Sequence, residues 1–312
     1  MWRKTLTLAL AAVAILAASL PRSPAITDLT GDYTRFFDAT QNMPQAERVR
    51  RFKALMTTRF PGFYDGKRAG GSQVGYDGRI TKSFAQFPSI RAKFVASAAA
   101  LGPQLASAQA AFRRTFTDAG ALPPTYLVHS LGEMDGGTRE IGGKTVLVFG
   151  ADVIALAHRA GSNERPFFEH EIFHTYHEPR LGECKPLWCS VWAEGLATYV
   201  AARLNPGATD DELLLTGGMR QAVEANRTAS ICAVRVRALS ENDEDYSALF
   251  TGSHHLPGFH DRIGYYVGYL VAKRIGDGHP LSEPANWKAQ TARPRVLAAL
   301  TELAPDCPSL PT

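Results

Sequence analysis

The sequence predicts an α+β fold that is mainly helical, with a small sheet next to one buried helix. Apolar residues recur at helical spacing before residue 121 and again after residue 150. Between these parts, Thr125–Ser130 and Thr145–Phe149 are short runs rich in β-branched and aromatic residues, as strands are. The helix that follows, at residues 166–179, carries the pattern H-E-x-x-H. We therefore expect a helical region at 26–121 and a domain built around that helix at 122–312.

Length and composition describe an ordinary globular protein. The chain has 312 residues, of which 45% are hydrophobic and 21% charged, enough for one large or two modest domains. Its formal charge is +4, and subtracting the three charges of Arg3, Lys4 and Arg22 leaves +1 for residues 26–312. A chain so close to neutrality gives no electrostatic reason to bind nucleic acid.

The first 25 residues have the pattern of a secretory signal peptide. A basic start at Arg3 and Lys4 precedes an apolar run from Leu6 to Leu20, and small residues end at Ala25. Fifteen residues rich in alanine are short for a membrane span. We expect cleavage near Ala25, export to the periplasm or the medium, and no stable membrane insertion afterwards.

Residues 26–121 predict helices that serve for packing, and no catalytic or binding motif is evident in them. Gln45–Phe60 places apolar side chains on one stripe, and a glycine-rich loop is expected at residues 66–78. Ser89–Ala119 then predicts a long helix, with a possible break at Gly102-Pro103. Beyond the first predicted strand, residues 132–144 suggest a loop or hairpin, and Asp152–Arg159 a short helix. An edge strand in this region could bind an extended peptide by strand addition.

The central motif is His170-Glu171-Ile172-Phe173-His174. Residues four apart share a helix face, so His170 and His174 can direct ring nitrogens at one ion while Glu171 projects toward its open side. Aromatic residues surround this helix, which predicts that it is buried, and buried histidines need partners. The alternative is a helix with two surface histidines. We expect one zinc ion here, Zn²⁺, with Glu171 as general base.

A carboxylate on a second apolar helix supplies a third candidate ligand. Glu194 lies near the start of Ser190–Arg203, where burial without a partner would be costly. The alternative is a first-turn glutamate stabilised by the helix dipole. Two histidines and one glutamate leave a fourth position open, as in catalytic zinc sites.

The rest of the chain is mainly helical. Helices are expected at Asp210–Val236, with a break around residues 217–218, at His260–Ile275 and at Pro294–Leu303, with a solvated loop at 241–245. The four cysteines predict two disulfides in an oxidising compartment, and three pairings are possible. We favour Cys184–Cys189, because these two are close in sequence, together with Cys232–Cys307. Free thiols, or a zinc site at Cys184 and Cys189, are less favoured.

Two segments resemble the gluzincin, or thermolysin-like, zinc metallopeptidases: HEIFH at 170–174 and WAEGLATY at 192–199. The resemblance implies that residues 122–312 form a zincin-like catalytic domain, with His170, His174 and Glu194 as ligands and Glu171 as base. Together with Gly264, Tyr265 and Gly268, it extends to a family of bacterial zinc-dependent proteases whose substrates are poorly defined. This family places a tyrosine at position 265, so Tyr265 is the favoured donor to the transition state. The residues left open as alternatives are Arg262, Tyr266, His254, His255 and His260.

The chain departs from related patterns at three positions. A metzincin would carry Gly at position 177 and His at 180, and this chain has His177 and Arg180, which excludes that group. His177 lies about 10 Å along the axis from His170, too far to bind the same ion. Thermolysin-like enzymes often carry an acid four residues after the glutamate ligand, where this chain has Thr198. The group that orients a ligand histidine is therefore not identified by the sequence.

These observations predict an exported zinc peptidase that hydrolyses peptide bonds of a peptide or protein substrate by a metal-activated water. One alternative is a zinc hydrolase of non-peptide amides such as those of cell-wall material. Another is a non-catalytic, zinc-stabilised binding or chaperone-like protein. An intact Glu171 favours catalysis, because a structural site has no use for a base. The oligomeric state and the cleavage specificity do not follow from the sequence.

Overall fold

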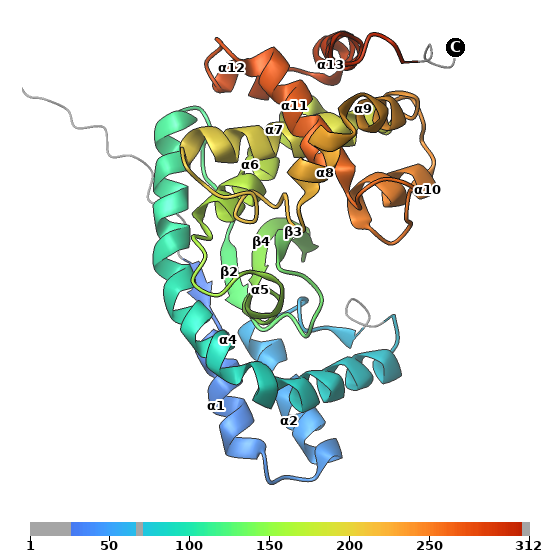
Figure 1. The fold of residues 1–312 in the computed structure, drawn as a ribbon. Helices are drawn as coiled ribbons and strands as arrows, with labels where there is room; N and C mark the ends of the chain where they lie inside the picture. Colours follow the sequence, from blue (N-terminus) through green and yellow to red (C-terminus); the bar gives the residue numbers. More distant parts are fainter. Residues whose placement is uncertain (1–25, 67–70, 308–312) are drawn as a thin grey trace, which may run out of the picture.

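The computed structural model describes residues 26–66 and 71–307. The predicted signal peptide, residues 1–25, lies outside this range. The predicted fold class is confirmed: the chain is mainly helical, with one small four-stranded sheet beside the helix that carries H-E-x-x-H (Figure 1).

The N-terminal part consists of β1 (Ile26–Asp28), α1 (Thr30–Thr40), α2 (Gln45–Arg59) and the 43-residue α4 (Gln73–Thr115). Burial of aromatic side chains holds these helices together. Tyr33 lies at the centre, with its ring centroid 5.9 Å from that of Phe52 and 4.9 Å from that of Phe87. Such rings bury large areas and prefer edge-to-face contacts, as here.

Helix α4 differs from the sequence prediction at its start and along its length. It begins at Gln73, inside the loop expected at 66–78, because the Ser72 hydroxyl accepts a hydrogen bond from Gly75 N and caps it. It also continues through Pro103, where a break was possible. Pro88 and Pro103 each remove one backbone hydrogen bond. The helix bends along its course, from above α2 to one side of the sheet (Figure 1).

The sheet has the strand order β1-β2-β4-β3, formed with β2 (Thr125–Val128), β3 (Gly136–Ile141) and β4 (Lys144–Gly150). Strands β1, β2 and β4 are parallel, and β3 pairs with β4 in antiparallel orientation from Gly136 opposite Phe149 to Ile141 opposite Lys144. The segment predicted as a loop or hairpin is therefore a hairpin. Strand β3 is an edge strand, and among the described residues no strand pairs with its outer side.

Three helices follow the sheet: α5 (Ala151–Ala157), α6 (Arg165–Leu181) and α7 (Trp188–Leu204). Helix α6 packs between α4 and α7 and against β3. Its apolar residues point to all these neighbours, which explains why it is aromatic around most of its circumference.

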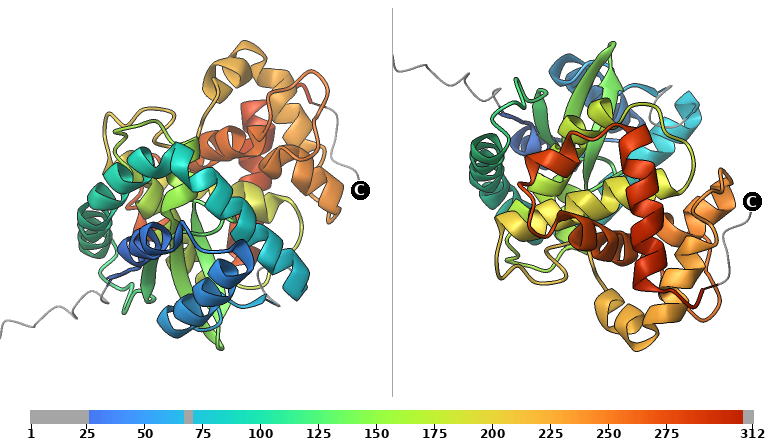
Figure 2. Two further views of the ribbon diagram at one scale, coloured as in Figure 1. Left: turned by 90° about the horizontal axis from the view of Figure 1, so that it is seen from below. Right: turned by 90° about the horizontal axis from the view of Figure 1, so that it is seen from above.

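The C-terminal part covers α7 at the end of the molecule opposite α1 and α2 (Figure 2). Residues 210–218 form turns rather than the expected helix, and residues 241–245, expected as a loop, include the start of a short helix. The elements are α8 (Met219–Ala225), α9 (Arg227–Arg235), α10 (Asp243–Tyr246), the π-helical η1 (Ser247–Thr251), α11 (Ile263–Gly276), α12 (Ser282–Ala285) and α13 (Ala289–Leu303).

Two glycines allow α7 and α11 to approach closely. A Cβ placed on Gly195 would lie 2.1 Å from the carbonyl carbon of Gly268, and one on Gly268 would lie 2.4 Å from the carbonyl oxygen of Val191. No side chain fits between the helices here. The contact lies one residue after Glu194 and three after Tyr265, so it fixes how these two side chains face each other.

The disulfides pair as predicted, Cys184 with Cys189 and Cys232 with Cys307. Both are compatible with an exported protein. Within the part of the chain that the structure describes, no helix has the length and apolar character needed to cross a membrane.

Candidate metal centre

The structure brings the three predicted ligands together. His170 and His174 lie one turn apart on α6, and their Nε2 atoms are 3.0 Å from each other. Glu194 projects from α7, with Oε2 3.1 Å from His170 Nε2 and 3.4 Å from His174 Nε2. Neighbouring helices therefore supply two imidazole nitrogens and one carboxylate oxygen to a single point.

This donor set fits a zinc ion. Zinc binds histidine nitrogen and carboxylate oxygen at about 2.0–2.2 Å, and a tetrahedral arrangement of such bonds separates the ligand atoms by roughly 3.3 Å. The three observed separations lie close to that value. In residues 26–66 and 71–307, no other three histidine, cysteine or acidic side chains form such a group.

Electrostatics at this point favour the charged forms of Glu194 and His174. Burial alone would raise the pKa of Glu194, but the adjacent His174 and His170 hold it well below its usual range. In the same way, burial would lower the pKa of His174, but the Glu194 carboxylate raises it well above the ordinary value. The Glu194 side chain is 21% exposed, against 3% for His170. The carboxylate thus lies on the side of the centre that solvent can reach.

Each ligand histidine has an oxygen near its second nitrogen. The Thr198 hydroxyl lies 3.5 Å from His170 Nδ1 and donates to the Glu194 backbone carbonyl at 2.9 Å. The Glu178 carboxylate lies 3.2 Å from His174 Nδ1, although this nitrogen makes no well-directed hydrogen bond. Such partners orient metal-binding histidines. Thr198 occupies the position where thermolysin-like enzymes, which the sequence resembles, often carry an acid. Glu178 was missed, although its spacing of four residues from His174 was a usable signal.

Glu171 lies beside the ligands and faces the edge strand. A Cβ on Gly137 of β3 would be 3.7 Å from Glu171 Oε2, so the strand passes directly over the carboxyl group. Burial raises the pKa of Glu171 to about 8, and the negative charges of Glu194 and Asp135 add to this, while His174 opposes it. A carboxyl group with a pKa in this range can both accept and return a proton near neutral pH.

Tyr265 is the predicted donor that lies at the centre. Its ring stacks against His170 with centroids 6.4 Å apart, and the Arg262 guanidinium lies 4.5 Å from the ring centroid on α11. Burial raises the pKa of Tyr265, and the Glu194 charge raises it further, so the phenol remains protonated and able to donate. Arg262, one of the alternative donors, therefore lies next to Tyr265 on the same side of the candidate centre.

The other candidate donors either have partners elsewhere or lie on an exposed loop. Tyr266 donates to Glu224 at 2.6 Å. His255 is exposed and pairs with Asp261, while His260 contacts the Gly217 carbonyl. His254 is exposed on the same loop. His177, which shares a helix face with the ligands, is fully buried, and its Nδ1 lies 2.9 Å from the Ala285 carbonyl, so it supports the packing of α12.

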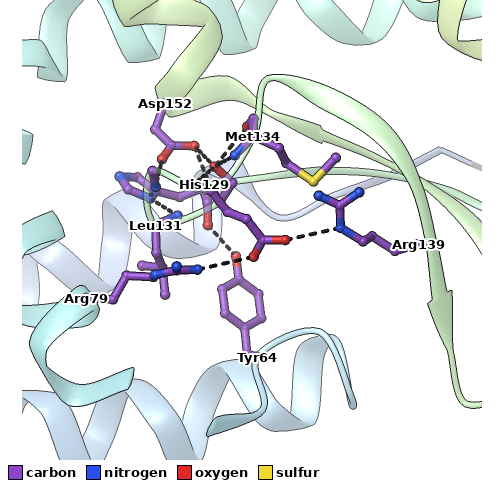
Figure 3. A network of polar contacts seen from close by, with 10 residues as sticks. Tyr64, Arg79, His129, Leu131, Met134, Arg139 and Asp152 are labelled. Carbon is purple, nitrogen blue, oxygen red and sulfur yellow. Dashed lines mark hydrogen bonds and ion pairs between the residues drawn. The ribbon is translucent and has the colours of Figure 1, made fainter. Parts of the chain in front are cut away.

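A buried aspartate holds the loop that leads into β3. Asp152 accepts hydrogen bonds from the backbone nitrogens of Ser130 and Gly132 at 2.6 and 2.7 Å (Figure 3). The Tyr64 hydroxyl donates to the His129 carbonyl at 2.8 Å from the other side (Figure 3). These bonds fix the loop between β2 and β3 to α5 and to the turn that follows α2.

Glu133 of this loop adds two ion pairs, 3.5 Å to Arg79 of α4 and 3.1 Å to Arg139 of β3 (Figure 3). Farther along, Asp135 lies 3.5 Å from His158 Nε2, and Glu164 lies 2.7 Å from His158 Nδ1. Although burial opposes it, these two carboxylates raise the pKa of His158 to about 9. The edge strand is thereby fastened at its start, next to Glu171. No local sequence signal predicts these ion pairs, because their residues come from three separate segments of the chain.

Comparisons with protein-family models, with curated proteins and with solved structures find no match to this chain.

Proposed function

We propose that the protein is a zinc-dependent peptidase with His170, His174 and Glu194 as metal ligands and Glu171 as general base. The observation that carries the proposal is the convergence of these three ligand atoms next to a carboxyl group that binds none of them. A structural zinc site is closed by four protein ligands, whereas three ligands leave room for water.

When bound, zinc would act as a Lewis acid and lower the pKa of water at the centre. Glu171 would take a proton from the attacking water and return it to the leaving nitrogen. Tyr265, kept protonated by burial, would donate a hydrogen bond to the developing oxyanion. Arg262, over the Tyr265 ring, adds positive charge on the same side.

The edge strand favours an extended peptide as substrate. Strand β3 has a free backbone edge, and an extended chain can pair with such an edge by strand addition. Gly137 lies beside Glu171 and has no side chain that would hold a substrate away from this carboxyl group. A peptide bond is therefore a better fit than an isolated amide of cell-wall material.

The pattern of the first 25 residues supports export of the proposed enzyme to the periplasm or the medium, and the two disulfides are compatible with it.

The proposal is tested with the chain from residue 26 onward and its Glu171→Gln variant, with Glu241→Gln as control because Glu241 is an exposed loop residue. We expect about one zinc per chain in all three proteins, measured by elemental mass spectrometry. Hydrolysis of a mixed peptide library should fall roughly 10²- to 10⁴-fold in Glu171→Gln alone. Native protein without zinc would refute the metal centre. Zinc without peptide hydrolysis would favour the zinc-stabilised binding protein, and equal activity in Glu171→Gln would exclude this base.

A further inference from the structure

A cleft of about 580 Å³ adjoins the candidate metal centre. One wall is the face of β3 that carries Thr138 and Glu140, and the other is the second half of α6, with His174, Thr175 and Glu178. This volume lies in the range of ligand pockets. His174, which is only 7% exposed, belongs to the lining, and its Nδ1 makes no hydrogen bond within the protein. The cleft is therefore continuous with the site of the proposed chemistry.

The charged lining of this cleft is entirely acidic apart from His174. Glu140 comes from β3, Glu178 from α6, and Glu183 from the turn after α6, and no lysine or arginine is among the described residues that line it. Glu140 accepts a hydrogen bond from Thr145, and Glu178 approaches His174. In the described part of the chain Glu183 is in no ion pair. Three carboxylates from three segments surround one space whose described lining contains no lysine or arginine.

A peptide paired with β3 would place side chains in this space. Successive side chains of a strand point to opposite sides, and alternate ones share a face. Thr138 and Glu140 are two residues apart and both point into the cleft. A substrate strand on the free edge of β3 continues the sheet, so every second side chain of the substrate faces the same way as this pair.

We propose that the cleft receives a lysine or arginine side chain of the substrate, next to the bond that is cleaved. This inference rests on the proposed function, because it assumes a peptide on the edge of β3. Carboxylates attract a cationic group and repel an acidic one, and the effect weakens as salt screens it over a Debye length of about 8 Å at physiological ionic strength.

The test measures binding, so it does not require turnover. Zinc-loaded Glu171→Gln protein is titrated into fluorescein-labelled, end-blocked peptides in which one position at a time is lysine, norleucine or glutamate, and anisotropy gives the Kd. Norleucine keeps the aliphatic chain without the charge. We expect lysine to bind at least tenfold more tightly than norleucine at one position, glutamate to bind more weakly than either, and the difference to shrink in high salt.

Variants locate the effect. Adding Glu140→Gln and Glu183→Gln should reduce the preference for lysine to less than threefold, whereas Asp306→Asn, an exposed carboxylate after α13, should leave it unchanged. Glu178 is kept, because it contacts a candidate ligand. Equal Kd values for lysine and norleucine at every position would overturn the inference, as would a preference that survives both substitutions or the binding of no peptide.

The two proposals fail differently. Suppose that the native protein hydrolyses no peptide but its Glu171→Gln variant still prefers lysine through Glu140 and Glu183. This result would refute the proposed activity and support the acidic binding cleft. Hydrolysis of peptides by the native protein without any preference for lysine would support the proposed activity and refute the proposed role of the cleft.

Discussion

Substitution of Gly268 by alanine tests whether the glycine contact between α7 and α11 sets the geometry of the candidate site. The new Cβ would lie 2.4 Å from the Val191 carbonyl oxygen and 3.0 Å from Gly195 Cα, against about 3.4 Å or more for ordinary contacts. Both neighbours are backbone atoms of a buried helix, so they cannot rotate away. Helix α11 must then move by about 1 Å relative to α7, as overpacked cores do.

The expected cost has two parts. Overpacking of this kind typically destabilises a protein by about 1–3 kcal/mol. Activity should fall further than stability, because Glu194 and Tyr265 lie within one turn of the contact, and a displacement of about 1 Å in a catalytic group can cost roughly 100-fold in rate. We therefore expect Gly268→Ala to lower the free energy of unfolding in urea by about 2 kcal/mol and peptide hydrolysis by about two orders of magnitude.

Gly102→Ala is the matched control. Gly102 lies inside α4, and its added Cβ would meet no atom within 4 Å. Alanine has the higher helix propensity, so this variant should be about 1 kcal/mol more stable than the native protein, with unchanged activity. If Gly268→Ala were as stable and as active as Gly102→Ala, the close contact would not position the site.

Three further predictions concern Thr198 at the candidate centre, His158 near the start of β3, and the two disulfides. Thr198→Val should lower zinc affinity about tenfold in a competition assay with a chelator, because it removes the hydroxyl near His170 Nδ1, and unchanged affinity would show that this hydroxyl does not orient the ligand. The pKa of His158 is raised from 6.5 to about 9, so its charge contributes stability below pH 6.5 that is lost as pH rises through 9. The free energy of unfolding should therefore drop by up to about 3 kcal/mol between pH 6.5 and 10 in the native protein, and by much less in His158→Gln. Serine at both Cys232 and Cys307 should lower the free energy of unfolding by about 4 kcal/mol, because this disulfide closes a long loop. Loss of the Cys184–Cys189 disulfide, which closes a short loop, should lower it by only about 2 kcal/mol. Equal losses in thermal or urea unfolding would contradict this prediction.

Local patterns predicted the elements best where one physical requirement dominates. The spacing of His170 and His174 already implies a shared helix face, and the aromatic residues around them imply burial, as the structure has it. The start of α4 was missed because glycine and polar residues at 66–78 indicate a loop, whereas the Ser72 cap and the packing of Tyr76 and Ile80 favour a helix. Local propensity is weak there, and tertiary burial decides the outcome.

The relative placement of distant segments was the part that sequence could not supply. Strand β1 has only three residues, and it forms because its backbone pairs with β2 nearly a hundred residues later. The choice of Tyr265 over Tyr266 came from a family resemblance. The structure distinguishes the two tyrosines by their surroundings, since Tyr266 donates a hydrogen bond to Glu224 while Tyr265 lies against His170.

The charges of the candidate centre give an argument of their own for a cation. Without metal, the buried Glu194 carboxylate keeps its charge because His174 holds a proton beside it, and each raises the tendency of the other to stay charged. A zinc ion held by the three ligand atoms, as proposed, would take the place of this proton and release it, as metal binding to histidine generally does. If this point served only to pack two helices, apolar side chains would be expected here, because their burial has no desolvation penalty like that of charged groups. The retained charges, with an uncoordinated Glu171 at their side, favour a centre that binds metal and moves protons.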